Sequence, residues 1–292
     1  MVDAAKLVIG MDGGGSGCRA AVSTLDGTVI GRSESGAANF TSDPEGTLAS
    51  ILRAVAELAE SIDQPIDTLL AAPAHLGLAG IITPDDATSF AQRLPFKSCR
   101  VSDDQLTSVI GALGDRDGAL IGVGTGSFIA MKRRDRIDAI GGWGLELGDQ
   151  GSGAWLGKQA LQRCALVADG LADPSLLIAT LMQRFKKDAG ELIRFARAAR
   201  PSDYAQFAPV VFDAAKHGDT YATRLVSEGA SYFDQCLNSF DLKKDDVVCL
   251  VGGLSESYAL RLNSAFQEKL SEPAGSALDG ALRLARKLAS KG

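Results

Sequence analysis

The chain has 292 residues, which is enough for roughly two domains with separate hydrophobic cores. Hydrophobic residues make up 46% and charged residues 23%, a composition typical of globular proteins that excludes a largely disordered chain. Thirty basic and 36 acidic residues give a net charge of −6, so we do not expect nucleic acid as a partner. The uncharged stretch 68–84 is too short to cross a bilayer and is interrupted by proline and glycine, so we do not expect a membrane as a partner.

Cysteine and histidine are sparse and scattered. The five cysteines include no Cys-x-x-Cys pair, and the first residues carry Asp3 and Lys6 rather than a signal peptide, a pattern that favours reduced thiols and a cytoplasmic protein. With only His75 and His217 present, a zinc site built from several histidines is disfavoured. We expect His75 to be a core residue and His217 to lie at the C-terminal end of a helix.

Residues 7–113 alternate between strand and helix patterns, and a glycine-rich turn joins the first two strands. The expected elements are strands at 7–11, 18–23 and 29–31, a helix at 44–61, a strand within 69–80, a helix at 84–93, a strand at 99–102 and a helix at 105–113. This order predicts an α/β fold.

The opening pattern of strand, glycine turn, strand, charged turn and strand recurs after the polar stretch 114–118, which predicts an internal duplication. The expected elements are strands at 119–123, 127–132 and 137–140, helices at 153–168, 175–185, 189–199, 204–216 and 220–238, a strand at 247–251, and helices at 261–270 and 277–288. Each half therefore begins with a mixed sheet.

Glycine is abundant, at 33 residues, and gathers at 10–17, 122–126 and 141–153. Glycine loops suit nucleotide sites because their backbone N–H groups can point at phosphate oxygens. The loop from Asp12 to Gly17 lacks the lysine of a P-loop, and a strand rather than a helix follows it. Asp12 is a candidate neighbour of Mg²⁺, and Ser16 is a candidate hydrogen-bond donor to phosphate. Taken by itself, this loop is equally explained as a tight hairpin with a surface carboxylate. The presence of a second such loop, at 124–127, favours the interpretation that both loops bind the same polyphosphate.

Three further segments are candidates for site chemistry. Asp103 and Asp104 lie between a strand and a helix, where one carboxylate can cap the helix and the other can accept a proton from a hydroxyl. In 141–153, Trp143 and Asp149 suit a ligand that carries hydroxyls, and the alternative is a buried tryptophan beside a turn. Gly252-Gly253 follows a strand and can lie against an adenine, or form an ordinary junction.

In combination, these segments resemble the sugar kinase, heat-shock protein 70 and actin superfamily. Within it, the chain is similar to the branch of N-acetylglucosamine kinases, bacterial glucosamine kinases and acyl-CoA dehydratase activators, the BadF/BadG/BcrA/BcrD ATPase family. The segments that carry the resemblance are Asp12–Ser16, Ser35–Asn39, Asp104, Gly124–Ser127, Gly148–Gly153, Asp203–Pro209 and Ser276–Leu282.

The resemblance implies a duplicated ribonuclease H-like (actin-like ATPase) fold, with two mixed five-stranded sheets around a cleft. The domains would be 1–116 and 117–276, with the helix 277–292 packed back on the first. It also implies an ATP- and Mg²⁺-dependent kinase that phosphorylates the 6-hydroxyl of glucosamine or N-acetylglucosamine, with a homodimer possible. The resemblance implies that Asp104 is the general base and that Asp12 lies at the metal. The implied sugar contacts are Asn39, Asp104, Gly142, Trp143 and Asp149. The implied phosphate contacts are Gly13, Gly14, Gly15, Ser16, Thr125 and Gly126, and the implied adenosine contacts are Gly252 and Gly253.

The chain departs from the family pattern at three places. Asp103 stands where relatives often have Asn or Thr, so either Asp103 or Asp104 is a candidate base. Gln105 replaces a residue that is usually small. Trp143 is not required in glucosamine kinases of the family, and it favours an N-acetyl sugar. Two alternatives stay open. An iron–sulfur activator ATPase of a dehydratase or reductase would need cluster cysteines, whereas here they fall mostly within predicted strands and helices. A non-catalytic sugar sensor would not need the phosphate loops and the base.

Overall fold

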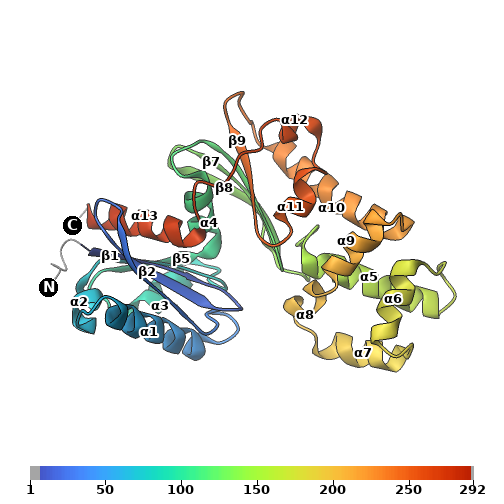
Figure 1. Ribbon diagram of the computed structural model, residues 1–292, viewed down its shortest axis with the longest axis horizontal. Coiled ribbons are helices and arrows are strands. Elements are labelled where there is room, and N and C mark those ends of the chain that lie inside the picture. Colours follow the sequence, from blue (N-terminus) through green and yellow to red (C-terminus); the bar gives the residue numbers. More distant parts are fainter. Residues whose placement is uncertain (1–6, 291–292) are drawn as a thin grey trace. The chain divides into compact units, whose positions relative to one another are not determined.

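A computed structural model describes residues 7–290 of the protein, which fold into two compact units (Figure 1). Unit 1 extends to Asp115 and resumes at Pro273, and unit 2 comprises Arg116–Glu272. The boundaries expected from the sequence lie after residues 116 and 276. The chain therefore crosses between the units twice, and each unit is described by itself below.

Unit 1 is built on a five-stranded mixed sheet with the order β3-β2-β1-β4-β5. The strands are β1 (Leu7–Gly13), β2 (Cys18–Thr24), β3 (Val29–Ser35), β4 (Ala74–Leu78) and β5 (Cys99–Asp103). β2 is antiparallel to β1 and β3, whereas β1, β4 and β5 are parallel. The parallel strands therefore end at the same edge of the sheet, which is where ligands of α/β proteins commonly bind.

Helices cover both faces of this sheet (Figure 1). They are α1 (Pro44–Ser61), α2 (Ile66–Ala71), α3 (Pro84–Arg93), α4 (Asp104–Leu113) and α13 (Ala277–Ala289). α1 starts where Asp43 accepts a hydrogen bond from the Gly46 N–H, and it buries a stripe that includes Ile51, Val55 and Leu58. α1 and α3 lie on one face of the sheet, and α13 packs on β1 and α4 on the other.

The contact between α13 and α4 depends on glycine. A Cβ atom at Gly111 would overlap the carbonyl of Ser276, and one at Gly280 would overlap the carbonyl of Thr107. The two helices therefore approach more closely than larger residues permit. Leu278 and Leu282 of α13 then reach Val8 in a small buried cluster, which makes α13 an integral part of unit 1.

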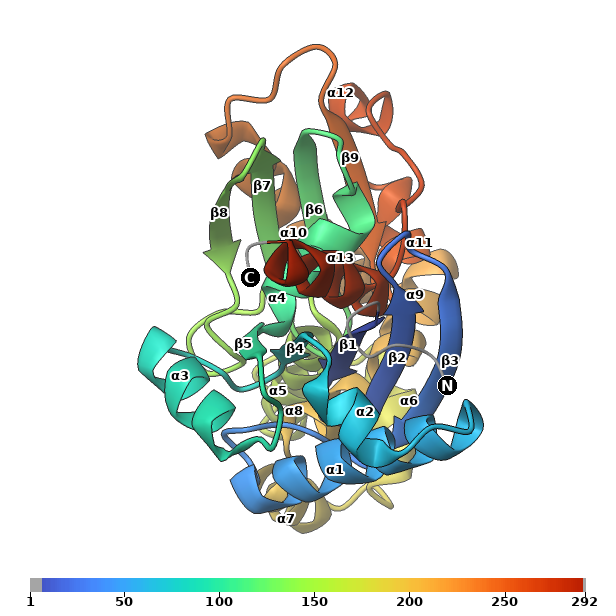
Figure 2. The same cartoon turned by 90° about the vertical axis from the view of Figure 1, so that its left-hand side faces the viewer.

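Unit 2 is built on a four-stranded sheet with the order β8-β7-β6-β9, and Figure 2 shows these strands side by side. They are β6 (Gly118–Val123), β7 (Ser127–Arg133), β8 (Arg136–Gly141) and β9 (Val247–Val251). A fifth strand was expected here. Its place beside β9 is taken by a single parallel bridge between Val248 and Leu270. Two sheets of the same strand order confirm the duplicated fold, with one strand reduced.

The rest of unit 2 is mainly helical. Its helices are α5 (Gly153–Ala168), α6 (Leu176–Arg184), α7 (Ala189–Ala198), α8 (Pro201–Ala205), α9 (Ala208–Lys216), α10 (Thr220–Ser239), α11 (Ser255–Ala259) and α12 (Ser264–Gln267). No helix among residues 7–290 is both long enough and apolar enough to cross a bilayer.

Two helices of unit 2 differ from the sequence prediction. The helix expected over 204–216 is divided into α8 and α9, because Pro209 has no N–H with which to continue a helix from the preceding turn. The helix expected over 261–270 is only α12, because the Asn263 side chain caps a new start at Ala265 N and Leu270 is already extended beside β9.

Candidate active site

In unit 1 three acidic residues meet at the carboxyl edge of the parallel strands. Asp12 stands near the end of β1 and pairs in register with Gly77 of β4, which in turn pairs with Ser102 of β5. Asp103 ends β5 and Asp104 begins α4. The fold therefore brings together the predicted metal residue and both candidate bases.

The two neighbouring carboxylates have different partners. Asp103 is the N-cap of α4, and its Oδ1 accepts a hydrogen bond of 2.8 Å from the Leu106 N–H. The Asp104 carboxylate accepts bonds from the N–H groups of its own residue and Gln105. Because the Asp103 carboxylate caps the helix, Asp104 is the better candidate for the base.

Partial burial raises the pKa of Asp104 to about 6, and the negative charges of Asp103 and Asp12 act in the same direction. A carboxyl with a pKa close to neutrality is suited to accept a proton and release it again. The ordinary aspartate pKa would make this group a much weaker base.

Asp12 carries a partner that the sequence analysis missed. The Arg19 guanidinium donates to the Asp12 carboxylate, and the two residues are directly opposite in the β1–β2 ladder. The hairpin register was the available signal, since two residues equidistant from a turn face each other. With Asp103 and Asp104 nearby, negative charge exceeds positive charge here, so the residues fit a divalent cation held by one carboxylate, phosphate oxygens and water.

The glycine loop between β1 and β2 borders this group. Gly14 and Gly15 have open space where side chains would lie, and Ser16 is exposed. The Gly14 carbonyl accepts from the Ala38 N–H at 2.9 Å, which holds the following residue, Asn39, beside the loop. The Asn39 Oδ1 accepts from Ser42 N at 3.0 Å. Thus Gly13, Gly14, Gly15, Ser16 and Asn39 all lie at this edge of unit 1.

In unit 2 the turn Gly124–Gly126 occupies the corresponding end of β6. The Gly124 N–H donates to the Gly126 carbonyl at 2.9 Å, and the carbonyls of Gly124 and Thr125 accept from the first N–H groups of α5. A Cβ atom at Gly126 would lie 2.9 Å from the Asp149 Oδ2. The turn that holds Thr125 and Gly126 is therefore packed directly against Asp149.

Asp149 is buried, and burial raises its pKa despite hydrogen bonds from the N–H groups of Ser127 and Gly144. Its backbone is in the left-handed region, with φ of 61°. The loop that holds it also presents Trp143, whose side chain is 71% exposed. The alternative of a buried tryptophan is therefore wrong, and an exposed indole beside Gly142 is open to a ligand.

The turn Gly252-Gly253 lies next to the same region of unit 2. The Leu254 N–H donates to the carbonyl of Val123, the last residue of β6, at 3.2 Å. Gly253 has open space on the side where a Cβ atom would project. The predicted phosphate, sugar and adenosine residues of unit 2 thus form one continuous group of turns.

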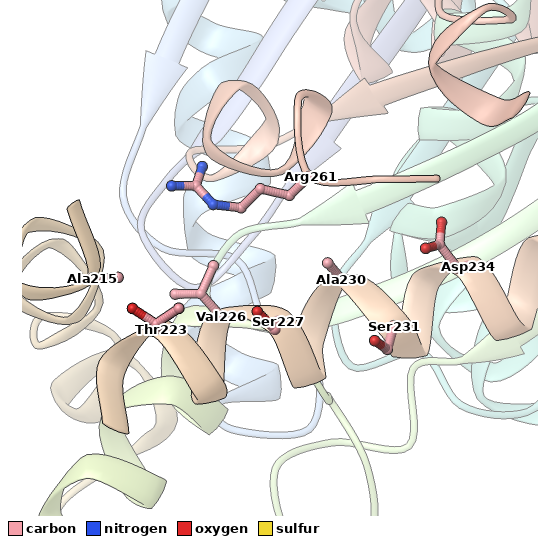
Figure 3. Close-up of a pocket in the computed structure, with 8 residues that line it drawn as sticks. All are labelled: Ala215, Thr223, Val226, Ser227, Ala230, Ser231, Asp234 and Arg261. Carbon is pink, nitrogen blue, oxygen red and sulfur yellow. The ribbon is translucent and has the colours of Figure 1, made fainter. Parts of the chain in front are cut away.

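A separate hollow of about 260 Å³ runs along α10 in unit 2 (Figure 3). The Asp234 carboxylate in its wall accepts from the Asn263 N–H at 3.0 Å, and the Arg261 guanidinium stacks over the Phe212 ring at 5.5 Å. None of the predicted site residues lines it. Its charged groups are held by protein partners, so the hollow is distinct from the site.

Comparison with known proteins extends over nearly the whole chain. A glucosamine kinase from Vibrio cholerae is 30% identical over 280 residues, which cover 96% of this chain and 95% of that protein. A crystal structure assigned as an N-acetylglucosamine kinase from Chromobacterium violaceum is 29% identical, with a TM-score of 0.87 over 97% of this chain and 99% of that one. A ROK-family glucokinase from Streptomyces griseus, solved with glucose and AMPPNP, shares the fold at 17% identity and a TM-score of 0.58.

The duplicated sheets, with a glycine turn at the end of the first strand of each, define the actin-like fold. Residues 9–282 match the BadF/BadG/BcrA/BcrD ATPase family, and the chain belongs to it.

Proposed function

We propose that the protein is an ATP-dependent amino-sugar kinase that transfers the γ-phosphoryl group to the 6-hydroxyl of glucosamine or N-acetylglucosamine. The observation that carries the proposal is Asp104, a partly buried carboxyl with a pKa of about 6 at the edge of unit 1. The similarity to a glucosamine kinase along almost the whole chain supports it.

In this proposal Asp104 accepts the proton of the 6-hydroxyl while that oxygen forms a bond to the γ-phosphorus. The bond between this phosphorus and the β,γ-bridging oxygen breaks, and ADP leaves with the electron pair. Mg²⁺ bound near Asp12 would offset charge on the phosphates. Because phosphoryl transfer depends mainly on alignment and charge stabilisation, the remaining residues act by holding the two substrates.

Each unit has its own candidate ligand contacts in this proposal. The phosphates would contact Gly13, Gly14, Gly15, Ser16, Thr125 and Gly126, adenosine would contact Gly252 and Gly253, and the sugar would contact Asn39, Gly142, Trp143 and Asp149. The open backbone at Gly14, Gly15 and Gly253 supports a close approach of ligand. The exposed face of Trp143 supports stacking on a sugar ring.

The alternatives have less support. The cysteines lie in strands and helices, four of the five are buried, and burial raises the pKa of thiols such as Cys18 and Cys164, which disfavours cluster ligation. A sensor without turnover would have no need for the raised pKa of Asp104.

The test measures ADP release with MgATP and a panel of glucosamine, N-acetylglucosamine and glucose, and identifies the product by its ³¹P–¹H coupling. We expect ADP release that depends on an amino sugar and a phosphate on carbon 6. ADP release independent of any sugar would contradict the proposal. Asp104→Asn is the matched control, since it keeps the size of the side chain and removes the base.

A further inference from the structure

The proposed function does not use His75, although this residue lies close to the base. His75 stands in β4, where its side chain is 5% exposed, and its Nε2 is 3.1 Å from the Oγ of Ser102 in β5. In the parallel ladder His75 pairs with Arg100 and Gly77 pairs with Ser102, so His75 and Ser102 project from the same face of the sheet.

The hydrogen bonds of Ser102 determine which way the protons point. The Ser102 Oγ donates to the carbonyl oxygen of Asp103 at 2.9 Å. A hydroxyl has a single proton, so the Oγ accepts from His75, and the ring carries its proton on Nε2. Burial and the positive charge of Arg100 lower the pKa of His75 to about 4, which keeps the ring neutral near pH 7.

The acceptor at the end of this chain belongs to the peptide group that joins Asp103 to Asp104. The N–H of the same peptide stabilises the ionised Asp104 carboxylate and lowers its pKa. A hydrogen bond at a peptide carbonyl polarises the whole peptide and strengthens its N–H as a donor. The chain from His75 through Ser102 therefore ends on the group that holds the carboxylate of the base.

We propose that His75 is a positioning residue, which acts through the Ser102 hydroxyl on the Asp103–Asp104 peptide to fix the orientation of the catalytic carboxylate. The inference rests on the proposed function, in which Asp104 is the base. His75 touches neither substrate in this scheme, so its loss should affect the rate of transfer and leave substrate binding intact.

The test compares His75→Leu, His75→Gln, Ser102→Ala and the double variant His75→Leu/Ser102→Ala. We expect kcat to fall about tenfold in His75→Leu and Ser102→Ala, with KM for sugar and ATP within about twofold of wild type. The Gln amide N–H can replace the ring N–H, so His75→Gln should recover most of kcat. The double variant should be no slower than the worse single variant, because both changes break one chain.

Leu76→Val is the matched control for general damage to β4. Leu76 is fully buried beside His75 but projects from the opposite face. This variant should unfold at a lower temperature and keep the kcat of wild type for the folded fraction.

The positioning role is refuted if His75→Leu keeps the wild-type kcat, if only KM changes, or if the two losses multiply in the double variant. Ser102→Ala and His75→Gln decide the question if His75→Leu does not fold. Retained turnover in Asp104→Asn, or no sugar-dependent turnover in wild type, would refute the proposed function itself and the positioning role with it. Failure confined to the His75 and Ser102 variants would refute the positioning role alone.

Discussion

Replacement of Asp104 by asparagine separates the chemical role of this carboxylate from its cost to the fold. Removal of a general base is expected to lower kcat by about 10²–10⁴, because proton acceptance contributes that much in comparable reactions. The Asp104→Asn variant should still bind ATP, since the proposed phosphate contacts lie elsewhere. Isothermal titration with a non-hydrolysable ATP analogue measures this binding.

The same change should stabilise unit 1. The pKa of Asp104 is raised from 3.8 to about 6 in the folded protein, and a tenfold change in proton affinity corresponds to about 1.4 kcal/mol. The whole difference in pKa would amount to about 3 kcal/mol, which we reduce to about 1–2 kcal/mol because the side chain is only partly buried. Asparagine carries no charge and avoids this cost, so the unfolding temperature at pH 7.5 should rise by about 3–8 °C.

The sign of the pH dependence makes the prediction specific. The folded state binds the Asp104 proton more tightly than the unfolded state, so this group reduces stability as the pH rises from about 4 to about 6. Below pH 4 the carboxyl is protonated in both states, and the difference between variant and wild type should disappear. Scanning fluorimetry of the ligand-free protein between pH 3 and 8 measures this difference in unfolding temperature. A variant that is no more stable than wild type at pH 7.5, or equally more stable at every pH, would refute burial of the charge as the source of the cost.

Four further outcomes are expected. In wild type, kcat/KM should rise about tenfold per pH unit up to about pH 6 and then level off, as steady-state kinetics will show, because Asp104 must be ionised to accept a proton. Asp103→Asn should keep helix stability and activity while Asp103→Ala loses about 1 kcal/mol in chemical denaturation, because the residue caps α4. Gly126→Ala should raise the KM for sugar, since the added methyl group displaces Asp149, and an unchanged KM would argue against Asp149 at the sugar. Trp143→Ala should raise the same KM and change the unfolding free energy by less than about 0.5 kcal/mol, because the side chain is exposed.

The positions of the strands along the chain and the duplication could be predicted from the sequence, because glycine turns and apolar strands are local signals. The division of 204–216 was missed although its signal is in the sequence, since Pro209 fits only the first turn of a helix and α9 therefore has to start beside it. The reduction of the fifth strand of unit 2 could not be predicted from the sequence, because the single bridge between Leu270 and Val248 depends on how distant segments pair.

The choice between Asp103 and Asp104 shows a limit of sequence reasoning at the candidate site. Both are acids at a strand–helix junction, and both are good helix caps, so residue type does not separate them. The two residues are separated by the direction of their side chains, because the Asp103 carboxylate accepts a hydrogen bond from the Leu106 N–H and the Asp104 carboxylate does not. His75 was expected in the core and is found there, but its bond to Ser102 depends on the register of β4 and β5.

The return of α13 to unit 1 has a consequence for how the protein is made. Unit 2 is one uninterrupted stretch of chain, whereas unit 1 needs residues from Pro273 onward to complete it. On the ribosome, Val8 and Ala21 therefore lack the cover of Leu278 and Leu282 until translation has passed unit 2 entirely. The second unit can reach its native state first, and the nascent first unit keeps an apolar surface for chaperones to shield until its last helix emerges.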